Sequence, residues 1–139
     1  MNFTLLLLFA LFGQSQNTDT VDLEIIVTNI NTLKGNIEIG LYNEPAAFPK
    51  ENQQYQEYIK PVNNDTMVFL LQDLPKGNYA VALYHDVNSD EECNLNFLGI
   101  PTEAYGFSKN FRPRFSKPSF EDCVIEASQN LSAEIQLID

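Results

Sequence analysis

The sequence predicts an all-β protein: an antiparallel β-sandwich of six to seven strands with one long ordered connection. Apolar and polar residues alternate over several short segments, which is the pattern of strands that bury one face. Turn residues, chiefly Gly, Pro and Asn, separate these segments. No segment shows a long amphipathic helix pattern, and two packed sheets are the architecture that buries such alternating faces.

The first residues are typical of an export signal. Residues 1–15 contain an apolar run from Leu5 to Phe12, which is shorter than the roughly 20 apolar residues needed to span a bilayer. We therefore predict a signal peptide over 1–15 and a single β-sandwich domain over 16–139, secreted or periplasmic, with no membrane insertion after cleavage. No basic residue precedes the run, so a buried N-terminal strand is the alternative.

The chain is strongly acidic, with 19 acidic and 8 basic residues and a formal net charge of −11. A surface that binds nucleic acid or anionic lipid has to be basic, so this balance argues against such partners. The hydrophobic content of 44% and the ten Phe residues predict a packed core rather than disorder.

The first half of the domain contains two clearly alternating segments, 21–30 and 35–43. The Gly-containing link between them predicts an antiparallel hairpin. Residues 44–64 are less regular, and the stretch 53–62 fits either a helical turn or an edge strand that ends at Pro61.

The second half begins with the clearest hairpin pattern, two alternating strands over 65–86 that are joined by the turn sequence LPKGN. The last two strands are predicted over 120–127 and 131–138. Between these pairs lies a connection over 86–119, longer than ordinary loops and therefore a candidate for function. Its aromatic residues predict an ordered cap over the sandwich.

The front of this connection carries oxygen-bearing side chains on alternate positions. Asp86, Asn88, Asp90 and Asn94 form a pattern that can turn several oxygens toward a hard cation, so calcium is a possible cofactor. However, Glu91 stands where a calcium loop needs glycine for its sharp turn. An acidic turn without metal is the alternative.

The back of the connection holds four basic residues, Lys109, Arg112, Arg114 and Lys117. Such a cluster can bind a carboxylate, sulfate or phosphate group. It can equally be the internal counter-charge of the acidic turn.

His85 is the only histidine. A hydrolase that uses His85 with Asp86, Glu121 or Asp122 is conceivable, but no nucleophile motif such as GxSxG accompanies it. A histidine at the end of a strand can also be a hydrogen-bonding anchor. The two cysteines, Cys93 and Cys123, allow one disulfide if the protein is exported, and two free thiols otherwise.

Residues 74–127 resemble the DUF2141 family of uncharacterised exported bacterial proteins. The motifs that carry the resemblance are LPKGNYA (74–80), HDVN (85–88), NFLGIPTEAYGFS (96–108) and PSFEDC (118–123). The resemblance implies a secreted or periplasmic single-domain β-sandwich of Ig-like or transthyretin-like type, and it implies no established activity.

Departures from the family pattern bear on the turn after His85. Where members have glycines in this turn, the chain has Ser89 and Glu91, which weakens the calcium hypothesis. Cys93 and Cys123 both replace other residues within the same motif block, which favours a disulfide between them.

We expect a non-catalytic module that binds a small ligand or an envelope protein at the face formed by 85–119. The alternatives are the hydrolase and a structural envelope component with a weak calcium-binding turn. The candidate ligand-binding residues are His85, Asn96, Tyr105, Ser108, Arg112 and Arg114.

Overall fold

The structure, a computed structural model, describes residues 19–96 and 98–139. The predicted signal peptide over 1–15 lies outside the described residues. The strands are β1 (Thr20–Thr28), β2 (Asn36–Tyr42), β3 (Gln56–Pro61), β4 (Met67–Pro75), β5 (Gly77–Asp86), β6 (Tyr105–Phe107), β7 (Ile125–Ala127) and β8 (Leu131–Gln136). The helical turns are η1 (Pro45–Ala47), η2 (Ser108–Asn110) and α1 (Phe120–Cys123).

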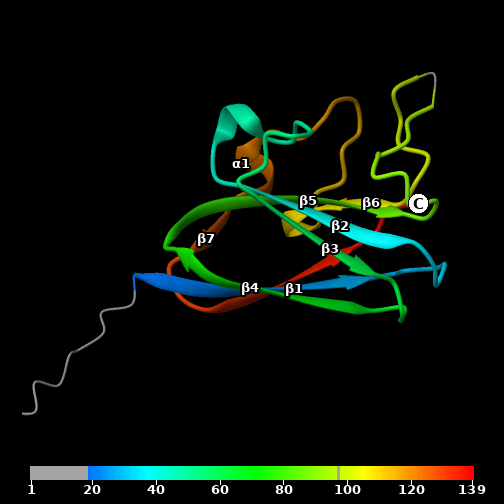
Figure 1. The fold of residues 1–139 in the computed structure, drawn as a ribbon. Coiled ribbons are helices and arrows are strands. Elements are labelled where there is room, and N and C mark those ends of the chain that lie inside the picture. The colour runs from blue at the N-terminus through cyan, green and yellow to red at the C-terminus, as the bar shows by residue number, and fades with distance from the viewer. Residues whose placement is uncertain (1–18, 97) are drawn as a thin grey trace, which may run out of the picture.

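These strands form the two layers of a β-sandwich, which confirms the predicted all-β class (Figure 1). One sheet has three strands in the order β4-β1-β8. The other has the order β3-β2-β5-β6, and β7 pairs with the start of β5. Within the described part of the chain, no helix is long and apolar enough to cross a membrane.

The core lies between the two sheets and is formed by every second side chain along the strands. Alternate residues of each strand face inward and are buried, as in Leu23 and Ile25 of β1 or Ile37 and Ile39 of β2. Gly106 of β6 also faces this core, and a Cβ atom there would lie 2.8 Å from a side-chain carbon of Ile135. Close contact between the layers at that point therefore requires glycine.

Both predicted hairpins were wrong, because each joins strands of different sheets. β1 pairs with β4 and β8, whereas β2 pairs with β3 and β5. Likewise, the chain leaves β4 at Pro75 and enters β5 of the opposite sheet at Gly77. An alternating apolar face is buried equally well by a hairpin or by a link that crosses between the layers, so alternation alone does not choose between them.

The link from β1 to β2 shows how the crossing is made. Asn29 takes a positive φ of 64°, and the following Ile30 is buried, which keeps the link inside the end of the sandwich. Gly35, with φ 73°, lies so close to β5 that a Cβ would be 2.1 Å from the carbonyl oxygen of Asp86. Glycine is needed there for both conformation and space.

Three further features of the fold do not follow from the alternating pattern of the sequence. β8 joins β1 in parallel, although the remaining strand pairs are antiparallel. The segment 120–127 is not one strand: Ser119 begins the short helix α1 with a capping box to Asp122, and only 125–127 extend as β7. The ambiguous stretch 53–62 contains the edge strand β3 rather than a helical turn.

Candidate functional site

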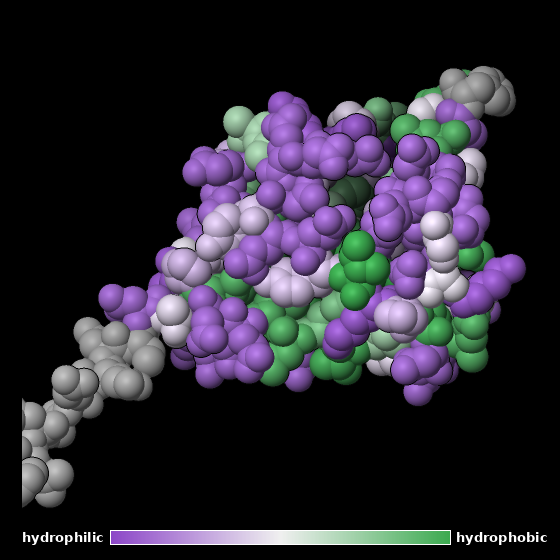
Figure 2. All heavy atoms as spheres, viewed as in Figure 1, coloured by the Kyte–Doolittle hydropathy of each residue, from purple (hydrophilic) through white to green (hydrophobic). Residues whose placement is uncertain are grey.

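The outer face of the larger sheet is covered by loops instead of a third layer. Segments 43–55, 87–104 and 110–119 stand over this sheet in Figure 1. They surround a groove of about 1240 Å³. Figure 2, in the same orientation, shows a shaded apolar hollow between two groups of polar side chains on this side of the molecule. A concave site of this kind is where a ligand is expected to bind.

The floor of the groove consists of two rows of residues that lie side by side across the strands. In one row, Gly40, Ala82 and Phe107 are in register on β2, β5 and β6. In the next row, Glu38 lies beside Tyr84 of β5. Gly40 and Ala82 line the groove, and the Tyr42 ring packs against Gly40, where a Cβ would lie 3.0 Å from a ring carbon.

The walls of the groove differ in chemistry along its length. Leu95, Leu98 and Ile100 of the 87–104 loop are between 52% and 68% exposed, so the tip of this loop presents apolar surface to solvent. The rim also includes charged residues of both signs. These are Lys50, Glu51, Glu57, Glu91, Glu92, Arg114 and Lys117. The prediction of a packed cap therefore fails for Leu95, Leu98 and Ile100, whose side chains are more than half exposed.

Glu38 is a buried carboxyl group on the groove floor and only 4% exposed. Its Oε2 accepts a hydrogen bond of 2.6 Å from the Tyr84 hydroxyl, whereas its Oε1 is buried with no hydrogen-bond partner. Burial raises the pKa of Glu38; the Tyr84 hydrogen bond opposes this, and the charge of Asp86 raises the pKa further. Sequence alternation placed Glu38 on the polar face of a strand and gave no sign that loops bury that face.

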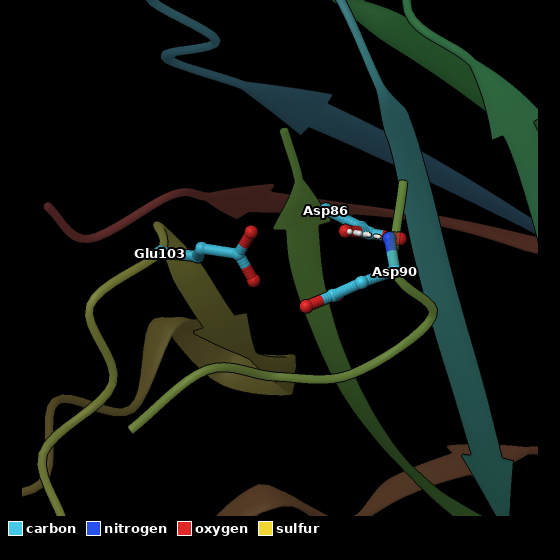
Figure 3. Close-up of side chains that lie close together, drawn as sticks. All are labelled: Asp86, Asp90 and Glu103. Carbon is cyan, nitrogen blue, oxygen red and sulfur yellow. Dashed lines mark hydrogen bonds between the residues drawn. The ribbon is translucent and has the colours of Figure 1, made fainter. Parts of the chain in front are cut away.

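The acidic turn lies next to Glu38, at the end of β5. Asp86 is fully buried, and one carboxylate oxygen each from Asp86, Asp90 and Glu103 lie within 4.8 Å of one another. Figure 3 shows the three side chains converging from the end of β5 and the two arms of the 87–104 loop. The structure therefore brings together two of the predicted metal ligands and adds Glu103, which no calcium-loop spacing indicates.

Hydrogen bonds order this turn. Asp86 accepts from the backbone N–H groups of Asp90 and Glu91, at 3.2 and 2.8 Å. Glu103 accepts from the backbone N–H groups of Val87 and Asn94, at 3.3 and 3.4 Å. The turn is thus held by carboxylates that accept from the backbone.

The remaining two predicted metal ligands, Asn88 and Asn94, also lie in the turn. Both donate from Nδ2 to Oδ2 of Asp90, at 3.1 and 3.0 Å. The backbone N–H of Glu92 and these amides lower the pKa of Asp90, whereas burial and the charge of Asp86 raise the pKa of Glu103. All four residues predicted to form the metal site therefore meet in one turn.

His85 is not part of the groove. Its side chain faces the core side of β5, is only 2% exposed, and its Nε2 lies 2.7 Å from the carbonyl oxygen of Lys34. This is the anchoring role, and it leaves the ring without access to a substrate. His85 is therefore not placed to act as the base that the hydrolase hypothesis assigned to it.

Two other predicted ligand-binding residues have structural roles. Ser108 is buried, and its Oγ accepts from the backbone N–H of Val81 at 2.9 Å and donates to the carbonyl of Cys123 at 2.5 Å. Asn96 shapes the loop tip, because its Oδ1 accepts from the backbone N–H groups of Leu98 and Ile100. Ser108 is thus enclosed, whereas Asn96 is exposed and stays a candidate for ligand binding.

The structure places the other three predicted ligand-binding residues, Tyr105, Arg112 and Arg114, at the groove or beside it. Tyr105 and Arg114 line the groove, on β6 and on the 110–119 loop. Arg112 lines a smaller adjacent hollow together with Phe111 and the rest of that loop. The basic residues donate no hydrogen bond to the acidic turn within the described residues, since the donors there are backbone and asparagine amides.

The two cysteines are free thiols in the structure. Cys93 is half-buried at the groove, whereas Cys123 is fully buried in a small cluster with Phe48 and Phe120. Burial raises the pKa of Cys93 to about 11 and that of Cys123 to about 12. A disulfide between them is not formed here and stays a prediction.

Fold and site together define a small β-sandwich domain with a loop-walled groove on one sheet and a carboxylate-rich turn at the end of that groove. The chain belongs to the DUF2141 family, described as uncharacterised proteins conserved in bacteria, whose model matches residues 25–136. This match confirms the resemblance seen in residues 74–127 and extends it through most of the first half. No curated protein and no solved structure matches the chain, so the finer Ig-like or transthyretin-like assignment stays a prediction.

Proposed function

We propose that the protein is a non-catalytic binding module, exported to the periplasm or the cell exterior, that holds a small organic ligand in the groove of the larger sheet. The observation that carries this proposal is the groove itself, which is lined on the sheet side by Ala82, Tyr84 and Phe107 and walled by the surrounding loops. A concave surface with aromatic side chains and a few polar groups is the usual form of a small-molecule site.

The lining favours a ligand that contains a ring. Tyr84, Tyr105 and Phe107 provide aromatic surface on neighbouring strands, on which a sugar or aromatic ring can pack. The charged rim, with Lys50 and Arg114 as well as acidic residues, can bind polar groups at the edge of such a ligand. The ligand class is therefore a ring-bearing molecule with polar substituents.

A panel of disaccharides, nucleosides and aromatic amino acids tests this proposal by ligand-observed NMR. Replacement of Ala82 by Phe fills the groove floor and is expected to abolish a signal that the unchanged chain gives. Val68→Phe is the matched control, because Val68 is 47% exposed on a strand of the other sheet. Equal binding by the Ala82→Phe variant, or no binding from any class, contradicts the proposal.

Export is supported by the apolar run from Leu5 to Phe12, followed by the small residues Gly13 and Ser15. Expression of the full chain in a bacterium that secretes proteins, followed by fractionation and intact mass measurement, tests it. A product in the periplasm or medium that lacks about 15 N-terminal residues is expected. Full-length product in the cytoplasm contradicts export without affecting the groove proposal.

A further inference from the structure

The acidic turn has the dimensions of a coordination sphere. Calcium binds oxygen ligands at about 2.3–2.6 Å, so oxygens on opposite sides of one ion are about 5 Å apart. One oxygen each from Asp86, Asp90 and Glu103 lie within 4.8 Å of one another (Figure 3). All three can therefore contact a single ion at the centre of the turn.

The charge of the turn is not balanced by a basic side chain. The hydrogen bonds that reach these three carboxylates within the described residues come from backbone and asparagine amides, which are neutral. Carboxylates this close repel one another, most strongly at Asp86, which is fully buried. A cation removes this repulsion.

Glu38 provides a second, independent observation. It belongs to β2 rather than to the turn, is 4% exposed, and its Oε1 is buried without a hydrogen-bond partner. Glu38 stands opposite Tyr84, two residues before Asp86, so the two carboxyl groups are on the same face of the sheet, although Glu38 lies outside the group of three. A buried acceptor without a donor is costly, and one beside a second buried carboxylate indicates a positively charged ligand.

Asn88 and Asn94 can complete the site. Their Nδ2 groups now donate to Asp90, and a half-turn of either amide presents Oδ1 instead. Carboxylate and amide oxygens are the ligands of hard cations, and a set drawn from an irregular loop suits calcium, which accepts six to eight oxygens in irregular geometry. Magnesium requires a near-ideal octahedron and fits this turn less well.

We propose that Asp86, Asp90 and Glu103 bind one calcium ion, with Glu38 as a fourth carboxylate ligand from the neighbouring strand. The ion then joins the end of β5, both arms of the 87–104 loop and β2. This site is adjacent to the groove, but its occupation does not depend on any groove ligand.

Isothermal titration of calcium chloride into chelator-treated, dialysed protein tests the proposal with the metal alone as probe. One ion per chain is expected, with a Kd of about 10⁻⁵ to 10⁻³ M and weaker binding of magnesium. Binding should also raise the melting temperature, because the ion binds only the folded chain. No calcium binding up to the millimolar range overturns the proposal, whatever the groove binds.

Single substitutions then assign the ligands. Asp90→Asn and Glu103→Gln change side chains that are not fully buried, so folding is expected to survive, and each should weaken calcium at least about tenfold. Glu92→Gln is the matched control, since Glu92 is exposed in the same turn and outside the carboxylate group. If Glu92→Gln weakens calcium as much as Asp90→Asn does, general charge rather than a site is responsible.

Glu38→Gln tests the fourth ligand separately. It keeps the size of the side chain and is expected to weaken calcium about tenfold. Circular dichroism and a urea transition monitor its folding. A folded Glu38→Gln variant with unchanged affinity overturns the role of Glu38.

Discussion

Tyr84 donates its phenolic hydrogen to Oε2 of Glu38 across the β2–β5 pair, at 2.6 Å, and the two residues stand directly opposite each other in the register. This pair occupies the outer face of the sheet, where solvent would normally satisfy both groups. Because loops bury Glu38, the hydroxyl is the only side-chain donor that the carboxyl group has within the described residues. The bond therefore fixes the groove floor at its acidic end.

Replacement of Tyr84 by Phe removes this donor and leaves both oxygens of Glu38 buried without a partner. We expect the free energy of unfolding to fall by about 1–3 kcal/mol, measured by urea denaturation at neutral pH. Tyr55→Phe is the control, because Tyr55 is 41% exposed and its hydroxyl can reach water. Equal stability of the two variants contradicts a structural role for the bond.

Ser108 joins β5 to α1 through its two hydrogen bonds, to the backbone N–H of Val81 and to the carbonyl of Cys123. Ser108→Ala leaves a buried donor and a buried acceptor unpaired. The expected loss is about 2–4 kcal/mol of unfolding free energy by the same measurement. Ser116→Ala, at an exposed loop position, should change stability by less than about 0.5 kcal/mol.

Ser108 also shows what the sequence alone can and cannot predict. The alternation in residues 21–30, 35–43 and 65–86 correctly identified strands and their buried faces, because a half-buried strand leaves a period of two in the sequence. For a polar residue in a long connection, however, the sequence pattern does not distinguish a side chain that binds a ligand from one that binds the backbone of its own chain. Burial, which decides this for Ser108, comes only from the tertiary structure.

The pairing of strands could not be predicted from the sequence either. Nothing within residues 21–43 records that β1 and β2 lie in different sheets, since the crossing depends on Gly35 fitting against Asp86 far along the chain. Similarly, the metal-type spacing found Asp86 and Asp90 because they are close in sequence. Glu103 was missed because it reaches the turn from the far arm of the loop.

Reactivity of the reduced cysteines should follow both exposure and pKa. Cys93 is half-buried and Cys123 fully buried, so iodoacetamide is expected to modify Cys93 first in the folded protein. With a pKa of about 11, the rate at Cys93 should rise roughly tenfold for each pH unit from neutral pH. Peptide mass spectrometry over a pH series measures both rates.

One outcome would contradict the raised pKa of Cys93, and another would contradict the order of modification. A rate at Cys93 that already levels off near pH 8 to 9 would show an ordinary, solvated thiol. Modification of Cys123 before Cys93 would show that the cluster around Phe48 and Phe120 does not protect it. If protein purified without reductant resists alkylation even when denatured, the predicted disulfide forms instead.

Alkaline pH should destabilise the fold through Tyr42. Burial, reinforced by the charge of Glu51, raises the pKa of Tyr42 to about 12, from an ordinary value near 10. The folded state thus holds this proton more tightly than the unfolded state does, so the stabilisation is fully present below pH 10 and is lost between pH 10 and 12. The pKa of Tyr84 is raised as well, by burial and its bond to Glu38, and it acts in the same direction.

Urea transitions at pH 8, 10 and 11.5 measure this loss, to which Tyr42 is expected to contribute at most about 3 kcal/mol. Tyr42→Phe has no proton to lose and should show a smaller decline over this range. It should also be somewhat less stable than the unchanged chain at pH 8, because the Tyr42 hydroxyl donates to the carbonyl of Lys50 at 3.0 Å. An unchanged decline in Tyr42→Phe would mean that other tyrosines, and not Tyr42, govern the alkaline transition.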